Sequence, residues 1–492
     1  MTMTKLHVMT RSAAAACLAL LAGCAVGPDY RRPALPAMDY LPAPAAAAMR
    51  DERQVVDAEV PAQWWMLFHS PALDELVRGA LARSPSVAAA QASLRQASEM
   101  RRAQQAAFFP TVDASYSAAR QKIAAPIASP LASNADIFNL STAQLNVSYT
   151  PDLFGLNRRQ VESLRAQEQA QRWNVEATYL ALSANLVVAA ITEASLRAQA
   201  DATARQATLQ SDVLERFRQL QRLGENSELD VAQQESQLAS LQAALPGLRK
   251  QLAQQRDLVK ALAGLPPSAE VPELRLDELA LPEPLPLTLP STLVEHRPDV
   301  LMAEADLASA SADIGVAVAS RLPQVTLGVN SWGSSAASLS GLFAPGTAFW
   351  TLAGSATQTL VDGGALRHKE AAARAAYDQA EATWRGTVIN AFQNVADALQ
   401  AVQADAQAER ATHQALDIAG HMLQVSRRQL DLGDVSAVSV IQVEQAHQQA
   451  LVAAVQAKAQ RLSDAAALLQ ALGGGWWNRA GDAAAPVRAG AD

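Results

Sequence analysis

Two stretches of this sequence are too long and too regular for an ordinary globular core. Residues 156–222 contain no proline and repeat apolar side chains at helical spacing, and residues 365–431 do the same over an equal length. At 1.5 Å per residue, a helix of about 67 residues is roughly 100 Å long. Because helical propensity alone does not hold an exposed rod of that length, each helix needs partners along its side. The sequence therefore predicts an elongated, mainly helical protein.

The chain is also an internal duplication, in which landmarks recur at a nearly constant offset. Pro85 to Pro298 is an offset of 213 residues, and Gly224 to Gly433 is one of 209. Other matched landmarks are Pro110 and Pro323, Gly155-x-x-Arg158 and Gly364-x-x-Arg367, Arg218 and Arg427, and Glu235 and Glu444. Such self-similarity indicates repeated structural units. Each repeat is expected to contain a short helix, a β-hairpin, a very long helix and a return helix.

The long helices are expected to turn at Leu-Gly-x-x-Ser and run back as 225–263 and 434–472, forming antiparallel hairpins. Glycine suits the end of a helix and serine suits the N-cap of the next one. Pro246-Gly247 interrupts the first return helix, where we expect a kink.

Between the short and the long helices the apolar period changes from 3.6 to 2. Ala143, Leu145, Val147 and Tyr149 alternate with polar residues, and similar alternation follows Val325 and Trp350. Segments of about ten residues match tilted strands that cross a bilayer, although an ordinary two-layer sheet has the same alternation. Four strands do not close a barrel, and hydrocarbon does not tolerate unpaired edges. If the strands are in the membrane, the chain must oligomerise; two chains supply 8 strands and three supply 12.

The N-terminus has the pattern of an export signal. Lys5 and Arg11 flank the start of a short apolar run, residues 12–21, and small residues precede Cys24. The run is far shorter than the roughly 20 residues that span a bilayer as a helix. Leu21-Ala22-Gly23-Cys24 resembles a bacterial lipoprotein box, in which the cysteine carries the lipid; simple cleavage and release is the alternative.

The residues after Cys24 indicate where such a lipoprotein is sent. Ala25, rather than aspartate, implies the outer membrane under the lipoprotein sorting rules. Residues 28–61 are rich in proline and alanine and predict an extended tether.

Composition and motifs argue against nucleic-acid binding and against catalysis. The chain has 40 basic and 48 acidic residues, a formal net charge of −8. It has no Gly-x4-Gly-Lys-[Ser/Thr] phosphate loop and no His-Glu-x-x-His zinc motif, so no cofactor, metal or enzymatic activity is expected. The only cysteines are Cys17 and Cys24, and Trp64-Trp65 and Trp476-Trp477 are expected to pack rather than to form a ligand cage. The scattered histidines, expected on solvated faces, are His296, His368, His413, His421 and His447.

Several short motifs occur together along the chain. They are Val26-Gly27-Pro28-Asp29-Tyr30-Arg31-Arg32-Pro33, Trp64-Trp65-x-x-Phe68 with Pro71-x-Leu73 and Leu76, Asp152-Leu153-Phe154-Gly155, the two Leu-Gly-x-x-Ser turns, and Ala471-Leu472-Gly473-Gly474-Gly475-Trp476. With these motifs the chain resembles the outer-membrane efflux lipoproteins of Gram-negative bacteria, the nodulation-T branch of the TolC-like outer membrane factors, over about residues 21–477.

The resemblance implies a mixed α and β membrane protein. It implies a homotrimer with a 12-stranded transmembrane β-barrel, four strands per chain, that continues into a long periplasmic α-helical barrel. It further implies two partners, a periplasmic adaptor (membrane fusion) protein and an inner-membrane pump, usually of the resistance-nodulation-division type.

The resemblance also assigns candidate functional residues. The hairpin tips would contact the adaptor; their residues are Leu223, Gly224, Ser227, Leu432, Gly433 and Ser436. Family members often narrow this end with acidic rings, but here Ser439 and Gln442 stand six and nine residues after Gly433. Acidic gate candidates remain at Asp230, Asp431 and Asp434, and a strong cation-selective ring is not expected. Cys24 is the expected lipidation site.

The expected organisation follows from these boundaries. They are a signal peptide (1–23), a lipidated tether (24–70), a first repeat (71–264, hairpin about 110–150 and helices 156–263), a linker (265–289), a second repeat (290–474, hairpin about 323–361 and helices 365–472) and a tail (475–492). The leading functional hypothesis is a passive exit duct in the outer membrane for small molecules or drugs handed over by a pump. Three alternatives stay open: the channel of a type I protein-secretion system, a non-pore periplasmic scaffold lipoprotein, and an anchored hydrolase, for which no catalytic set is found.

Overall fold

The computed structural model describes residues 25–34, 55–56, 60–124, 136–281, 285–286 and 296–479. The expected signal peptide (1–23) and Cys24 lie outside the described residues. The chain forms two compact units, and each draws on both repeats. Unit 1 comprises described residues within Met1–Pro33, Leu94–Gln171 and Ala303–Trp384; unit 2 comprises those within Ala34–Ser93, Arg172–Met302 and Arg385–Asp492.

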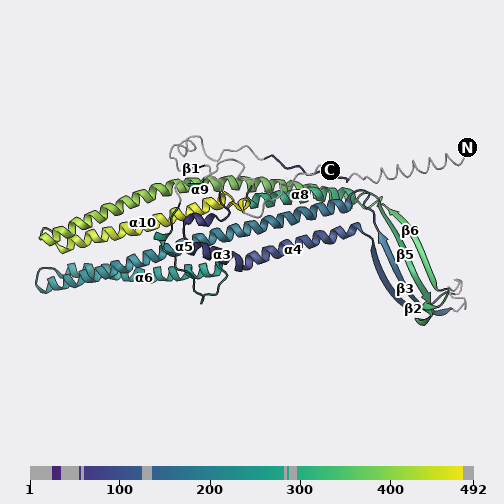
Figure 1. Ribbon diagram of the computed structural model, residues 1–492, viewed down its shortest axis with the longest axis horizontal. Helices are drawn as coiled ribbons and strands as arrows, with labels where there is room; N and C mark the ends of the chain where they lie inside the picture. The colour runs from purple at the N-terminus through teal and green to yellow at the C-terminus, as the bar shows by residue number, and fades with distance from the viewer. Residues whose placement is uncertain are drawn as a thin grey trace. The chain divides into compact units, whose positions relative to one another are not determined.

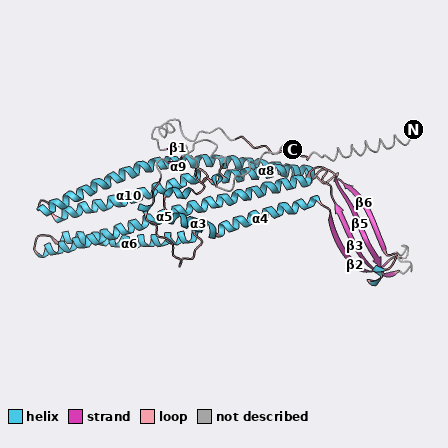
Figure 2. Cartoon of the chain, in the orientation of Figure 1, coloured by secondary structure: helices cyan, strands magenta, loops and turns pink. Residues whose placement is uncertain are grey.

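Each repeat contains the expected order of elements (Figures 1 and 2). The first has helices α3 (Pro71–Arg83) and α4 (Pro85–Gln105), strands β2 (Thr111–Lys122) and β3 (Ile137–Tyr149), and helices α5 (Leu156–Arg222) and α6 (Glu228–Leu262). The second has α8 (Pro298–Ala319), β5 (Gln324–Ala336), β6 (Ala348–Thr357), α9 (Ala365–Leu432) and α10 (Ala437–Ala471). α5 has 67 residues and α9 has 68. α6 is continuous through Pro246.

Short elements complete the described chain. Strands β1 (Val55–Val56) and β4 (Leu285–Pro286) pair in parallel. Single 3₁₀ turns are η1 (Trp64–Phe68), η2 (Ala106–Phe108), η3 (Leu276–Glu278), η4 (Ser340–Phe343) and η5 (Trp476–Asn478).

Unit 1 contains an antiparallel sheet of strand order β2-β3-β5-β6, so β2 and β6 are its two edges. The register aligns apolar residues across all four strands. One row is Val112, Val147, Val329 and Leu352, and the next is Ala114, Leu145, Trp332 and Trp350. Since successive strand residues point to opposite faces, one face of the sheet is apolar. The other carries polar residues, with hydroxyl pairs Thr142–Ser335 at 3.1 Å and Thr150–Thr326 at 3.3 Å.

The apolar face continues across an irregularity in β5. Both neighbouring strands shift register between Val329 and the residues that follow, which leaves Asn330 as an extra residue in β5. A bulge of this kind changes which residues share a face. It brings Trp332 onto the face of Val329, where strict alternation would have placed Ser331. Trp332 is 61% exposed, Trp350 72% and Leu352 71%, so the described residues leave large apolar side chains of this face uncovered.

Residues 25–34 are held against α5 within unit 1. The buried guanidinium of Arg159 donates to the backbone carbonyl oxygens of Val26 (3.1 Å) and Gly27 (3.4 Å) and to the carboxylate of Asp29 (2.8 Å). The Val26 N–H donates to the carbonyl oxygen of Phe154 at 3.2 Å. Hydrogen bonds to a charged group contribute about 1.5–3 kcal/mol each, so Arg159 fixes the segment that directly follows Cys24.

Two contacts with α8 support the same segment. Arg32 pairs with Glu304 at 3.0 Å. Gly27 lies so close to Gly315 that an added Cβ would lie 2.4 Å from the Gly315 Cα atom. No larger residue fits at Gly27 without displacing the backbone.

The core of unit 2 joins helices from both repeats. Its fully buried residues include Trp64, Phe68, Leu73, Leu186, Ile191, Leu399, Leu468 and Leu469. Within the described residues, α5 is the one helix long and apolar enough to cross a membrane by length and composition, and half of its most apolar window is buried inside the protein. Packing against α9 and α10 residues of the core accounts for that apolar stretch.

The tryptophan pairs take part in packing, as the sequence predicts. Trp64 meets Phe68 edge-on at a ring distance of 6.3 Å, and Trp476 lies 5.1 Å from Trp173 of α5. The Trp476 indole N–H donates to the carbonyl oxygen of His296 at 2.8 Å. The segments before and after the hairpins are therefore fixed to the core of unit 2.

The Arg159 contacts give a testable prediction. We expect Arg159→Ala to release residues 25–34, so that trypsin cleaves the Arg31–Arg32 bond at least about tenfold faster, since a tenfold change corresponds to about 1.4 kcal/mol. Arg165→Ala is the matched control, because Arg165 is an exposed arginine of the same helix, six residues further along. Equal cleavage rates in the two variants would show that Arg159 does not hold the segment.

Candidate functional site

The candidate site comprises the two hairpin turns of unit 2, and both turns end their long helices in the same way. In the first, the N–H of Glu225 donates to the carbonyl oxygen of Leu220 (2.9 Å) and the N–H of Gly224 to that of Gln221 (2.9 Å). In the second, Asp434 donates to Gln429 (2.9 Å) and Gly433 to Leu430 (3.0 Å). This pair of bonds is the Schellman motif, which satisfies the last carbonyl groups of a helix.

The motif explains why glycine stands at both turns. Gly224 has φ 80° and Gly433 has φ 81°, in the left-handed region where a side chain is strained. An added Cβ meets nothing within 4 Å at either residue, so backbone conformation, not space, requires glycine.

The following serines begin the return helices as the sequence predicts. Ser227 Oγ accepts from the N–H of Asp230 (3.2 Å), and Asp230 accepts in return from the N–H of Ser227 (2.9 Å), which makes a capping box. Ser436 Oγ accepts from the N–H of Ser439 (3.2 Å). The second turn therefore has the same cap without a carboxylate.

Capping gives Asp230 a role that the sequence analysis did not assign. Hydrogen bonds from the Ser227 hydroxyl and backbone N–H hold the pKa of Asp230 below its ordinary value. The carboxylate is thus ionised and engaged with its own turn. Of the other gate candidates, Asp431, Asp434 and Gln442 are exposed and Ser439 is half-buried. Their role in a gate stays a prediction.

An ion pair closes each hairpin behind its turn and occurs at matching residues of the two repeats. Arg218 of α5 pairs with Glu235 of α6 at 2.8 Å, and Arg427 of α9 pairs with Glu444 of α10 at 2.9 Å. The sequence analysis matched these residues between the repeats but did not predict that they pair. Their equal separation of 17 residues across a turn is the sequence feature that indicates a pair across each hairpin.

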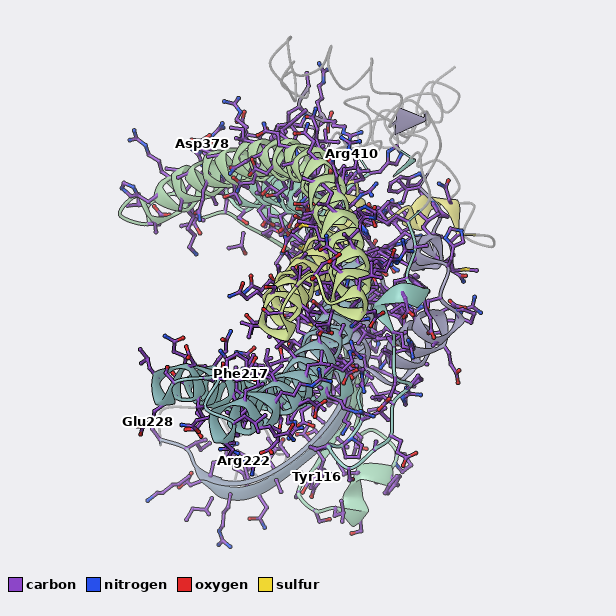
Figure 3. The ribbon with its side chains drawn as sticks, turned by 90° about the vertical axis from the view of Figure 1, so that its left-hand side faces the viewer. Tyr116, Phe217, Arg222, Glu228, Asp378 and Arg410 are labelled. Carbon is purple, nitrogen blue, oxygen red and sulfur yellow. The ribbon has the colours of Figure 1, made fainter. Side chains whose placement is uncertain are left out.

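The first hairpin also contacts the return helix of the second. Val213, Leu214 and Phe217 of α5 form a cluster with Val231 of α6, against which Val438 and Ile441 of α10 pack. Next to it the Gln210 side chain donates to Gln234 (2.9 Å) and accepts from Gln445 of α10 (3.0 Å). Figure 3 labels Phe217 and Arg222 near the end of α5 and Glu228 at the start of α6.

Large apolar side chains stand exposed at the tips. Leu223 is 73% exposed, Leu432 76% and Leu229 67%. Leu223 and Leu432 directly precede the two turn glycines, so the repeats present the same side chain at the same point. Exposed apolar residues at matching positions are typical of a protein–protein contact.

The described residues contain no group of three or more histidine, cysteine, aspartate or glutamate side chains that could hold a metal ion. His413 lies 4.0 Å from Glu409 on the same helix, and His296 stacks on Trp477 at a ring distance of 4.9 Å. Each of these histidines therefore contacts a neighbouring side chain.

The turn geometry predicts that alanine lowers stability at the turn glycines but raises it at a glycine inside a helix. We expect Gly224→Ala or Gly433→Ala to destabilise its tip by about 1 kcal/mol, because alanine is strained in the left-handed region. Gly247→Ala is the control: Gly247 lies inside α6 in open space, so alanine should stabilise the helix by about 0.5–1 kcal/mol. Hydrogen exchange of the amides around each site measures both effects, and faster exchange in all three variants would contradict this explanation of the turns.

Known proteins with the same architecture identify the family. The family model described as "Outer membrane efflux protein" matches residues 76–265 and 289–474. The chain is 30% identical to the pyoverdine export outer membrane protein OpmQ of Pseudomonas aeruginosa over 85% of this chain and 89% of that protein. It is 28% identical to the toluene efflux pump outer membrane protein TtgC of Pseudomonas putida over 94% of this chain and 95% of that protein.

Solved structures agree with the sequence comparisons. The outer-membrane channel OprN superposes with a TM-score of 0.82 at 26% identity, covering 92% of this chain and all of OprN. The outer membrane protein VceC of Vibrio cholerae gives a TM-score of 0.74 at 26% identity, covering 85% of this chain and all of VceC. The mixed α and β fold, the sheet in unit 1 and the paired hairpins in unit 2 are thus those of known channels, and the chain belongs to the outer membrane efflux protein family.

Proposed function

We propose that three copies of this chain form the outer-membrane exit duct of a tripartite efflux system. The main support for this proposal is the sheet of unit 1. It has an exposed apolar face, a polar face, and two open edges, β2 and β6. In a bilayer both edges need partners, which neighbouring copies supply. Three copies of four strands give a barrel of 12 strands, whose polar face lines a water-filled passage.

The exported compounds are inferred from relatives. Their names refer to the export of pyoverdine, toluene, antibiotics and solvents. These are small molecules, so we infer that this duct conducts small molecules. The relatives favour efflux over protein secretion, and the amphipathic sheet favours a duct over a scaffold without a pore. An export duct also accounts for the chain without invoking catalysis.

The tips are the proposed contact with the partners. Leu223 and Leu432, with the turn residues Gly224, Ser227, Gly433 and Ser436, would bind a periplasmic adaptor protein. The adaptor would connect the duct to an inner-membrane pump, of the resistance-nodulation-division type. Lipid attached to Cys24 would anchor the chain in the outer membrane, next to the segment that Arg159 holds.

The passive gate is proposed at the same end. Because Asp230 is engaged in its capping box, Asp431 and Asp434 are the remaining acidic candidates, with Ser439 and Gln442 as neutral neighbours. A gate of this composition closes through hydrogen bonds and apolar contacts rather than through a dense acidic ring.

Two adjacent residues of β6 test the membrane sheet. Leu352 lies in the apolar row with Val112, Val147 and Val329, and Thr351 lies on the opposite face. We expect Leu352→Arg to reduce outer-membrane assembly strongly, because arginine on the lipid side costs about 2–4 kcal/mol near the midplane. Thr351→Arg should assemble and shift the ion selectivity of the pore toward anions, measured as the reversal potential in planar bilayers. Equal assembly of the two variants, with unchanged selectivity, would argue against a membrane barrel.

The tip leucines test the adaptor contact. We expect Leu223→Asp and Leu432→Asp to assemble normally but to bind the adaptor about tenfold more weakly, which corresponds to roughly 1.4 kcal/mol of binding energy. Photocrosslinking to the adaptor should fall and drug susceptibility should rise. Leu258→Asp, at a 46% exposed residue of α6 far along the chain from the turn, is the matched control. Unchanged crosslinking in both tip variants would exclude these side chains from the contact.

A further inference from the structure

Two carboxyl groups meet across the second hairpin, away from its tip. Asp405 lies on α9, four residues before Glu409, and Asp464 lies on α10, three residues after Arg461. Because Glu409 and Arg461 form an ion pair across these antiparallel helices, the two aspartates face each other one turn further along. Oδ2 of Asp405 is inaccessible to solvent and accepts no hydrogen bond from a donor group within the described residues. Two facing carboxyl groups can form a hydrogen bond only when one of them carries a proton, and a shared proton would give the buried Oδ2 atom of Asp405 a partner.

The surrounding charges do not neutralise the pair. The charge of Arg461 on α10 favours the ionised form of Asp405, but Arg461 also forms an ion pair with Glu409 of α9. Asp464 accepts a hydrogen bond from the Gln460 side chain of its own helix at 2.9 Å. Glu409 adds a further negative charge, and His413 lies 4.0 Å from Glu409. The charged groups that face Asp405 are therefore Asp464, Arg461 and Glu409.

The pair sits at the margin of the core of unit 2. Val402, Leu462 and Ala465, close in sequence to the two aspartates, are buried members of that core. Burial, followed by the hydrogen bond and the charge of Asp464, raises the pKa of Asp405 to about 7. Because the raised pKa belongs to the folded state, the stabilising effect of the pair is greatest in acid and is lost as the pH rises through about 7.

The first hairpin has no such pair. At the repeat offset of 209 residues, Asp405 corresponds to Leu196 and Asp464 to Gln255, and Glu409 and Arg461 correspond to Ala200 and Leu252. Gln255 donates to the backbone carbonyl oxygen of Ala189 on α5 at 3.1 Å, a neutral contact that does not titrate. The two hairpins, alike in their turns, thus differ in the residues that face each other at this point.

We propose that Asp405 and Asp464 form a proton-sharing latch between α9 and α10, which loosens the second hairpin, and not the first, when the proton is lost. With both carboxylates ionised, like charges face each other in a partly buried site, and Arg461 is already paired with Glu409. The inference does not depend on what the duct exports or on which adaptor it binds.

Hydrogen exchange of the full-length protein in detergent tests the latch. Exchange is compared at about pH 6 and about pH 8.5 after correction for the intrinsic pH dependence of amide exchange. We expect amides in 400–412 and 458–468 to lose protection about tenfold at the higher pH, the change equivalent to one pKa unit of coupling. Amides in 191–203 and 249–259 of the first hairpin serve as the internal reference and should not change. No difference between the hairpins would overturn the proposal.

Variants then assign the response to the pair. Asp405→Asn and Asp464→Asn each keep a hydrogen bond between the helices without a titrating proton, so both should abolish the pH response. Asp417→Asn, at an exposed carboxylate of α9, should keep it. A response that persists in both pair variants would contradict the assignment. If neither variant assembles, infrared spectroscopy of the wild-type protein decides: the absorption of a protonated carboxyl group must be present at about pH 6 and disappear as the pH passes about 7, and its absence at pH 6 would refute the latch.

Discussion

The unpaired edges of the four-stranded sheet are the constraint on which the rest of this structure depends. Within the part of the chain that the structure describes, β2 and β6 each have one strand neighbour, so one edge of each is open, and large side chains such as Trp350 and Leu352 cover one exposed face. In water such edges invite aggregation, and in hydrocarbon each unsatisfied group costs several kcal/mol. Closing the sheet with other copies removes both penalties, so assembly and membrane insertion are one requirement.

The two repeats build their helical hairpins from the same kinds of residues. Both hairpins end in a left-handed glycine, restart at a serine cap and are closed by an Arg–Glu pair 17 residues apart. The differences between the repeats are consequently informative. Asp230 closes the first cap where Ser439 stands in the second, and the acidic pair Asp405–Asp464 replaces Leu196 and Gln255. The proposed titrating pair thus belongs to the second hairpin, and the first has Leu196 and Gln255 in its place.

Local features were predictable from the sequence because local chemistry determines them. The proline-free stretch 156–222 corresponds to α5, the alternating segments correspond to strands β3, β5 and β6, and glycine and serine mark the turns. Long-range features were not predictable in the same way. The two compact units each combine both repeats, and the contact of Val213, Leu214 and Phe217 with α10 joins residues far apart in the chain.

Two further details could not be predicted from the sequence, for specific physical reasons. The bulge at Asn330 interrupts the period of two, so the alternation pattern alone places Ser331 and Trp332 on the wrong faces. Arg159 is a buried arginine with two carboxylate and two backbone carbonyl partners, and the backbone acceptors cannot be recognised from residue types. Likewise, the sequence does not distinguish a capping carboxylate such as Asp230 from a free acidic residue, because only the structure shows its hydrogen bonds.

The number of chains in one particle tests the central claim most directly. Light scattering of the protein extracted from the outer membrane, with the detergent mass subtracted, gives that number without any assumption about partners or substrates. Closure of the sheet into a barrel predicts three chains of 52.0 kDa, less whatever is removed with the signal peptide. A monomer that stays in solution without detergent would contradict it, because a single chain would then keep both sheet edges and the apolar face in water.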